Sequence, residues 1–204
     1  MSESQFYYIT KEGKLINVET LADVIAEAKK GGYIWLDYSQ PTKEELSLLI
    51  EPFGLHPLSI EDCVDENQIP KIDDYPQYTF IIFNTFNYTK DLLSTSEVDM
   101  FLGADFLITV NVNGSSNQQF PGNIKRIVGL HPENAKQGPS FLLHVIMDQI
   151  VDHKFVATEA FENELDKAEE EIISDLANFN AATLLNLRRD LFSLRKSLFH
   201  EREI

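Results

Sequence analysis

Three carboxylates, Glu61, Asp62 and Asp65, crowd into a short part of the stretch HPLSIEDCVDENQIPKIDDYPQY. Pro57 suits the first turn of a helix, because its missing N–H would have no partner there and its φ is already helical. A helix over 57–64 is therefore expected, with the three acids toward water. Paired acids could act as a general acid and base, or they could attract cations.

Catalysis is the weaker of these two readings. Adjacency in sequence does not give paired acids the geometry that proton transfer needs. The chain also lacks a P-loop, a glycine-rich dinucleotide turn, a Gly-x-Ser-x-Gly motif, an HExxH motif and a paired-cysteine zinc pattern. The sequence therefore predicts a protein that is not an enzyme.

Composition narrows the possible partners. The 33 acidic and 17 basic residues give a net charge of −16, which argues against nucleic acid and anionic membrane surfaces and favours cations or basic partners. A single cysteine, Cys63, cannot form an internal disulfide and fits a reducing cytoplasm. No signal peptide is evident, and the longest apolar run, 141–151, falls short of the roughly 20 residues of a spanning helix. We therefore expect the chain as given to be soluble.

The first two thirds of the sequence alternate between strand and helix patterns, which predicts an α/β fold, an α/β/α sandwich with a mixed β-sheet. Thr20 and the Thr42–Glu45 capping box mark two helix starts, and the second helix is expected to run to Gly54. Polar loops are expected at 94–96 and 113–119. The strands are expected at 6–9, 15–18, 33–38, 78–88, 97–102 and 106–112, and a short helix near 124–130.

From residue 140 onward, apolar residues recur at steps of three and four, which predicts a long antiparallel helical hairpin. We expect an α/β/α domain over 1–139 and a hairpin over 140–204, with helices at about 140–177 and 181–204. The acids of the first helix and the bases of the second are expected to pair across the hairpin or to be solvated. The leucine repeat of the second helix continues to Leu198, close to the last residue of the given sequence. We therefore expect that the given sequence contains only part of this helix.

Four motifs in order carry a resemblance to the CorA family of divalent-cation transporters. They are HPLSIEDCVDENQIPKIDDYPQYTFIIF, VDMFLGADFLITVN, GPSFLLHVIMDQIVD and LRRDLFSLRKSLFHERE, and they span about residue 35 to the end. The resemblance implies an α/β/α cytosolic domain, two C-terminal transmembrane helices per subunit and a homopentamer around a central pore. The pore helix, its Gly-Met-Asn sequence and the stalk helix would all lie beyond Ile204, so this chain resembles a cytosolic N-terminal domain truncated before them.

The resemblance also implies a regulatory metal site between neighbouring subunits. By motif, Asp62 and Glu61 fall on one side of it and Asp148 is a further acidic contributor. Mg2+ suits such residues, because it prefers oxygen ligands and commonly uses one or two carboxylates. Other readings remain open: Glu61 and Asp62 could be ordinary solvated helix residues, and Asp148 could be a buried group satisfied by a neighbour. His56 is expected to be structural and Cys63 to belong to the core.

The function implied is that of a metal-sensing domain in a membrane transporter of Mg2+, with Co2+ or Ni2+ as further candidates. The full-length homopentamer would sit in the inner cell membrane, with this domain on the cytoplasmic side and the missing C-terminal helices in the bilayer. Its partners would be other copies of itself and divalent cations, with no nucleic acid. Two alternatives are a zinc transporter of the same family and a stand-alone soluble interaction protein whose hairpin docks a partner helix.

Overall fold

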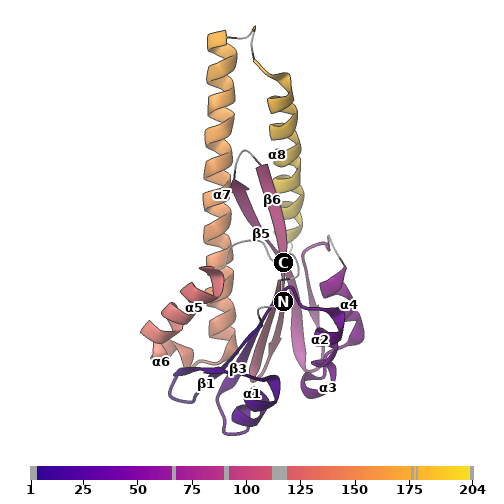
Figure 1. The fold of residues 1–204 in the computed structure, drawn as a ribbon, viewed down its shortest axis with the longest axis vertical. Helices are drawn as coiled ribbons and strands as arrows, with labels where there is room; N and C mark the ends of the chain where they lie inside the picture. The colour runs from indigo at the N-terminus through magenta and orange to yellow at the C-terminus, as the bar shows by residue number, and fades with distance from the viewer. Residues whose placement is uncertain are drawn as a thin grey trace.

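A seven-stranded sheet forms the centre of the protein in a computed structural model that describes residues 4–65, 68–89, 92–111, 119–175, 177 and 179–202 (Figure 1). The strand order is β2-β1-β3-β7-β6-β5-β4. Strands β3 and β7 run parallel and the other neighbours run antiparallel, so the predicted mixed sheet is confirmed. The strands are β1 Gln5–Ile9, β2 Leu15–Val18, β3 Tyr33–Ser39, β4 Lys71–Asp74, β5 Tyr78–Thr89, β6 Leu92–Gly103 and β7 Phe106–Asn111.

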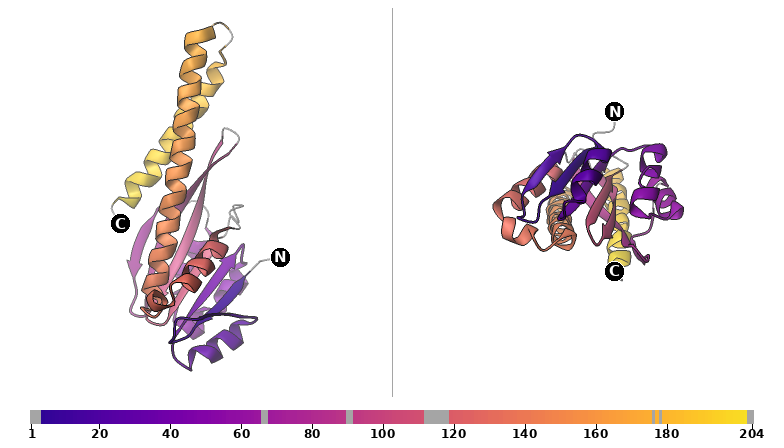
Figure 2. Two further views of the ribbon diagram at one scale, coloured as in Figure 1. Left: turned by 90° about the vertical axis from the view of Figure 1, so that its left-hand side faces the viewer. Right: turned by 90° about the horizontal axis from the view of Figure 1, so that it is seen from below.

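Helices cover both faces of this sheet, as Figure 2 shows in the view from below. Alternate residues of each strand point to opposite faces, so Leu36 joins one core and Trp35 the other. One face carries α1 Leu21–Ala28, α2 Lys43–Ser47, α3 Ile50–Phe53 and α4 Pro57–Val64; the other carries α5 Gln119–Leu130, α6 Pro132–Ala135 and the first part of α7 Pro139–Asp175.

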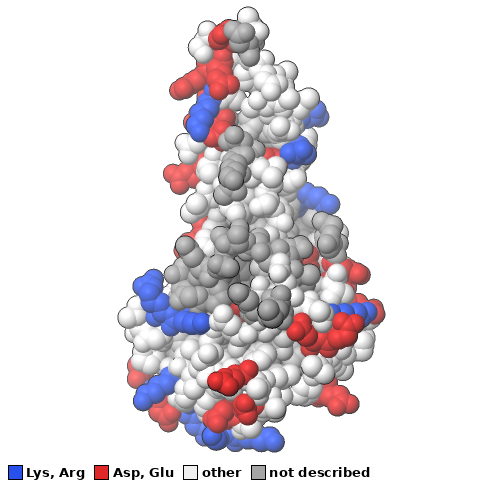
Figure 3. All heavy atoms as spheres, in the orientation of Figure 1, with Lys and Arg blue, Asp and Glu red and all other residues white. Residues whose placement is uncertain are grey.

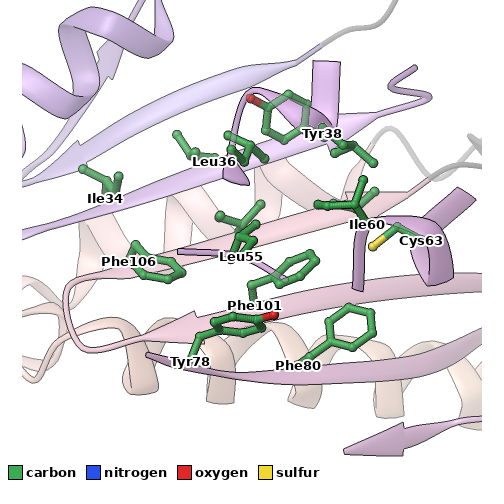
Figure 4. Packing of buried hydrophobic residues seen from close by; sticks show 14 of the residues in the cluster. Ile34, Leu36, Tyr38, Leu55, Ile60, Cys63, Tyr78, Phe80, Phe101 and Phe106 are labelled. Carbon is green, nitrogen blue, oxygen red and sulfur yellow. The ribbon is translucent and has the colours of Figure 1, made fainter. Parts of the chain in front are cut away.

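The core under α4 is rich in aromatic side chains. Ile60 and Cys63 of α4 point toward the sheet, where they meet residues of β3, β5 and β6 (Figure 4). Rings of Phe80 and Phe101 lie 4.7 Å apart between centroids, a favourable distance for a tilted aromatic pair. This packing fixes which side of α4 faces water, and the expectation that Cys63 belongs to the core is confirmed.

Beyond the sheet, the second half of α7 and α8 Ala181–Glu201 form a long antiparallel hairpin (Figure 1). The far ends of β5 and β6 extend past the other strands as a two-stranded ribbon, and this ribbon packs against the hairpin. Phe86 of the ribbon is buried with Phe161 of α7 and Leu187 of α8. The sheet and the hairpin therefore share a packed junction, while the domain division at 139/140 stays a prediction.

Four local expectations were wrong. The helix expected from Thr42 to Gly54 is divided into α2 and α3, because the Ser47 hydroxyl bonds the Lys43 carbonyl at 2.7 Å and Pro52 cannot donate a backbone N–H. Residues 94–96, expected as a polar loop, belong to β6, because their backbone pairs with β5 and is therefore extended. Strand β4 was not expected, and α5 begins earlier than the helix placed at 124–130. Most of the loop expected at 113–119 lies outside the described residues.

Candidate functional site

Helix α4 is fixed at its first turn by two side chains from outside it. His56 is the N-cap, and its Nδ1 accepts a hydrogen bond from the Leu58 N–H at 3.2 Å. The Tyr78 hydroxyl accepts the His56 N–H at 3.0 Å and lies 2.9 Å from Ser59 Oγ. The expected structural role of His56 is confirmed, and the helix is anchored to the start of β5.

The two acids of the motif lie at the exposed side of α4, and each has a lysine partner. Glu61 Oε1 lies 3.2 Å from Lys43 Nζ, with about half of each side chain exposed. Asp62 is 26% exposed, and its Oδ2 lies 2.9 Å from Lys71 Nζ. The same ammonium lies 2.8 Å from Asp73 Oδ2, so Lys71 bridges α4 and β4. Burial lowers the pKa of Lys71. Hydrogen bonds to Asp73 and Asp62 raise it by more than burial lowers it, so the pKa of Lys71 lies above its ordinary value.

Two further carboxylates face α4 from β6, and the sequence analysis missed both. Glu97 and Asp99 are two residues apart on one strand and therefore point to the same face. Glu97 Oε2 accepts the Gln68 N–H at 3.0 Å. Asp99 is 1% exposed, and its Oδ1 has no hydrogen-bond partner in the described part of the chain. Two acids at alternate positions of the otherwise apolar run 97–102 were the signal that could have found this pair.

Burial and the charges of neighbouring carboxylates keep these two acids from ionising easily. Burial and then the charge of Glu97 raise the pKa of Asp99 well above its usual range. Burial raises the pKa of Glu97 as well. The Cys63 thiol, which is also buried, has its pKa raised by burial and by the charge of Asp99. These raised pKa values favour the protonated, uncharged forms of Glu97, Asp99 and Cys63, so less negative charge lies beneath Asp62.

Asp148 lies on α7, on the opposite face of the sheet from α4. Val145, Ile146 and Ile150 of that helix pack into the core of that face, and Asp148 itself is exposed. The alternative in which Asp148 is buried is therefore wrong. Within the described residues no group of three or more His, Cys, Asp or Glu side chains is arranged to hold a metal ion. A single chain does not bring Asp148 to Asp62 and Glu61, so a shared site would need two copies.

Residues 30–204 match the family model described as CorA-like Mg2+ transporter protein. The chain belongs to this family. It is 32% identical over 174 residues to the protein YfjQ of Bacillus subtilis (strain 168), which covers 84% of this chain and 52% of YfjQ. It is 30% identical over 156 residues to the cobalt/magnesium transport protein CorA of Thermotoga maritima, covering 76% of this chain and 44% of that protein.

The fold of this CorA-family chain matches a solved structure, the soluble domain of CorA from Methanocaldococcus jannaschii. The TM-score is 0.72 at 21% identity, over 98% of this chain and 76% of that one. The chain spans about half the length of the two relatives above. In the part of the chain that the structure describes, no helix combines the length and the apolar character needed to cross a bilayer.

Proposed function

We propose that this chain is the cytosolic regulatory domain of a divalent-cation transporter that carries Mg2+ across the inner cell membrane. Co2+ and Ni2+ are further candidate substrates. The Thermotoga relative is named as a cobalt/magnesium transport protein, which supports this choice over zinc. In the full-length homopentamer this domain would face the cytoplasm and sense the internal concentration of the transported ion.

The observation that carries the proposal is the placement of the motif acids on two outward surfaces. Asp62 and Glu61 are accessible on α4, and Asp148 is accessible on α7 on the other side of the sheet. Neighbouring copies arranged in a ring could therefore bring Asp148 of one to Asp62 and Glu61 of the next. All three side chains offer carboxylate oxygens, the donors that Mg2+ prefers, and their exposure leaves room for its retained waters.

The chemistry of this shared site follows from repulsion between carboxylates. Two unit charges 4 Å apart repel by about 1 kcal/mol in water and by several times more in partly buried surroundings. A dication between the acids of two copies would relieve that repulsion and hold the copies together. When internal Mg2+ falls, the copies would separate more easily, and this shifts the population toward a conducting state.

The test is Mg2+ flux into liposomes that contain the full-length protein, measured as a function of Mg2+ on the cytoplasmic side. Asp62→Ala and Asp148→Asn should raise the concentration needed to inhibit flux, because each removes a ligand of the shared site. Asp65→Asn and Asp152→Asn are matched controls, since both are exposed acids, Asp65 at the C-cap of α4 and Asp152 on α7. Unchanged inhibition in Asp62→Ala would reject the regulatory assignment, and equal flux of Zn2+ and Mg2+ would reject the choice of substrate.

A further inference from the structure

An open cavity lies at the end of the molecule opposite the hairpin, beside α1 and α3 (Figure 1). Its volume is about 650 Å3, which is within the roughly 300 to 1,000 Å3 of small-molecule sites. We call it the α1–α3 cavity, and its lining comes from residues 25–29, 34, 52–54, 76–77 and 104–106. Glu61, Asp62 and Asp148 are not among these residues, so the cavity is separate from the proposed metal site.

Aromatic and aliphatic side chains form the inner wall of the α1–α3 cavity. Ile34 and Phe106 are partners in the parallel pair of β3 and β7 and are 2% and 6% exposed. Figure 4 shows both at one end of the core. The Phe106 ring lies 4.9 Å from the Phe53 ring between centroids, and Phe53 is only partly buried. A ligand that fits this wall has an apolar body, because its binding removes apolar surface from water.

The shape of this wall is fixed by the turn between β6 and β7. A Cβ atom on Gly103 would lie 2.2 Å from the Phe106 ring, so glycine at this position lets the ring lie against the turn. The Ile34 N–H donates to the Asp105 carbonyl at 3.0 Å and holds the same turn to the start of β3. The wall is therefore formed before any ligand binds, which reduces the entropy cost of binding.

Two exposed groups of opposite charge also line the cavity. Lys29 is the C-cap of α1, and Asp105 lies in the turn between β6 and β7. Within the described chain neither side chain forms an ion pair, whereas the adjacent Lys30 pairs with Glu27 at 2.6 Å. Figure 3 shows groups of both signs at this end of the molecule. A ligand with one carboxylate and one ammonium group would complement both charges.

We propose that the α1–α3 cavity binds a zwitterionic dipeptide with large apolar side chains. Its ammonium group would lie at Asp105 and its carboxylate at Lys29, with its side chains against Phe53 and Phe106. Gln77 also lines the cavity, and its amide can both donate to and accept from the peptide bond. A free amino acid carries the same charges but has only one side chain for a cavity of this volume, and a long polypeptide would not place both of its ends here.

This binding site goes beyond the proposed transport function and does not depend on it. It is tested by calorimetric titration of the present chain with the dipeptide leucyl-phenylalanine, for which we expect saturable binding to one site. The N-acetylated and C-amidated forms should each bind up to about fivefold more weakly, the range of an exposed ion pair. Absence of dipeptide binding up to about 5 mM would overturn the proposal, and so would equal binding of a form blocked at both ends.

A filled cavity gives the first variant test. Ala104 is exposed at the turn and lines the cavity, so Ala104→Trp should weaken dipeptide binding about tenfold or more by occupying its space. Lys14→Gln and Asp166→Asn remove exposed charges that do not line the cavity and should bind like the wild type. Circular dichroism and thermal melts show that each variant is folded. Normal binding by folded Ala104→Trp would reject this cavity as the site.

Pairing variants with blocked peptides tests the orientation. Lys29→Gln should weaken binding of the free dipeptide up to about fivefold and leave binding of the C-amidated form unchanged, because that form lacks the carboxylate. Asp105→Asn should act in the same way on the free dipeptide and leave the N-acetylated form unchanged. If Lys29→Gln weakened the C-amidated and free dipeptides equally, Lys29 would not hold the carboxylate, and the proposed orientation would be wrong.

Discussion

Lys71 Nζ lies 2.9 Å from Asp62 Oδ2, so the carboxylate proposed as a regulatory ligand is already paired with an ammonium group of its own chain. Asp73 shares this ammonium at 2.8 Å. A cation that binds Asp62 must compete with Lys71 for the same oxygen. This competition would weaken Mg2+ binding, and it suggests a way to make the sensor more sensitive.

The first prediction removes this competitor. In the full-length protein, Lys71→Gln should lower the Mg2+ concentration that half-inhibits flux, because Asp62 loses its internal partner. A partly exposed ion pair contributes about 0 to 1 kcal/mol, so the shift should be at most about fivefold. Lys14→Gln, a remote exposed lysine, is the control. A rise in the inhibitory concentration in Lys71→Gln would show that Lys71 supports the site and does not compete for it.

The second prediction concerns the buried ion pair between α7 and α8. Lys154 Nζ lies 2.5 Å from Glu201 Oε2, both side chains are less than 10% exposed, and the ammonium lies 3.8 Å from the centre of the Phe83 ring. Lys154→Met leaves a buried carboxylate without its partner and should lower the free energy of unfolding by about 3 to 5 kcal/mol in urea titrations.

The double variant Lys154→Met/Glu201→Leu should recover most of that loss, because no uncompensated charge remains in the junction. Lys136→Met removes an exposed pair with Glu133 and should change stability by less than about 1 kcal/mol. If the double variant were as unstable as Lys154→Met, the lost stability would come from packing of the lysine stem and not from the unpaired charge.

The third prediction is a pH dependence at Asp37. Trp35 Nε1 donates to Thr109 Oγ1 at 3.1 Å, and Thr109 Oγ1 donates to Asp37 Oδ1 at 2.6 Å. Burial raises the pKa of Asp37 to about 6, although the Thr109 hydrogen bond and the charge of Lys125 oppose the rise. An unfolded aspartate has a pKa of about 3.9. The folded state therefore holds this proton over a range in which the unfolded chain has released it.

For an acid whose pKa is higher in the folded state, stability is fully present below about pH 4 and is lost as the pH rises through about 6. Asp37→Asn should remove this loss. The gain of Asp37→Asn over the wild type should be about 2.5 kcal/mol larger at pH 7.5 than at pH 4, at about 1.4 kcal/mol per pKa unit. Urea titrations at both values measure it, and Asp105→Asn on an exposed turn is the control. A gain that does not depend on pH would mean that Asp37 ionises normally.

Local signals in the sequence predicted the elements that carry the site. The helix over 57–64 was predicted at its observed bounds, with its start marked by Pro57, and the Thr42–Glu45 capping box forms as expected. Both features depend on hydrogen bonds or backbone angles within one turn, so a few residues determine them. The layered α/β/α arrangement followed from the order of these elements.

Contacts between distant segments could not be predicted in the same way. The exposed position of Asp148 depends on which side of α7 faces the sheet, and the Lys71–Asp62 pair depends on β4, an edge strand that the sequence does not signal. Asp99 faces Cys63 across the gap between β6 and α4, 36 residues apart in the chain by their numbering. Strand pairing and helix docking bring these groups together, and neither is encoded locally.

The fourth prediction uses Cys63 to test whether the layer beneath Asp62 is closed. The thiol is buried, and burial together with the charge of Asp99 raises its pKa. The thiolate is the reactive form, and an ordinary free cysteine has a pKa of about 8.5. At pH 8, Cys63 should therefore react with a disulfide reagent much more slowly in the folded chain than in urea, at a rate set by opening of the structure.

A matched exposed thiol makes this test quantitative. Ser174→Cys places a thiol on the exposed side of α7, and in a Cys63→Ala background it should react at the rate of a free thiol in the folded chain. Asp99→Asn keeps the shape of the side chain and removes its charge, so Cys63 should stay protected in that variant. Fast reaction of Cys63 in the folded wild type would mean that α4 separates readily from β6. Asp62 would then sit on a mobile helix, and a metal site there would have to be ordered by the ion itself.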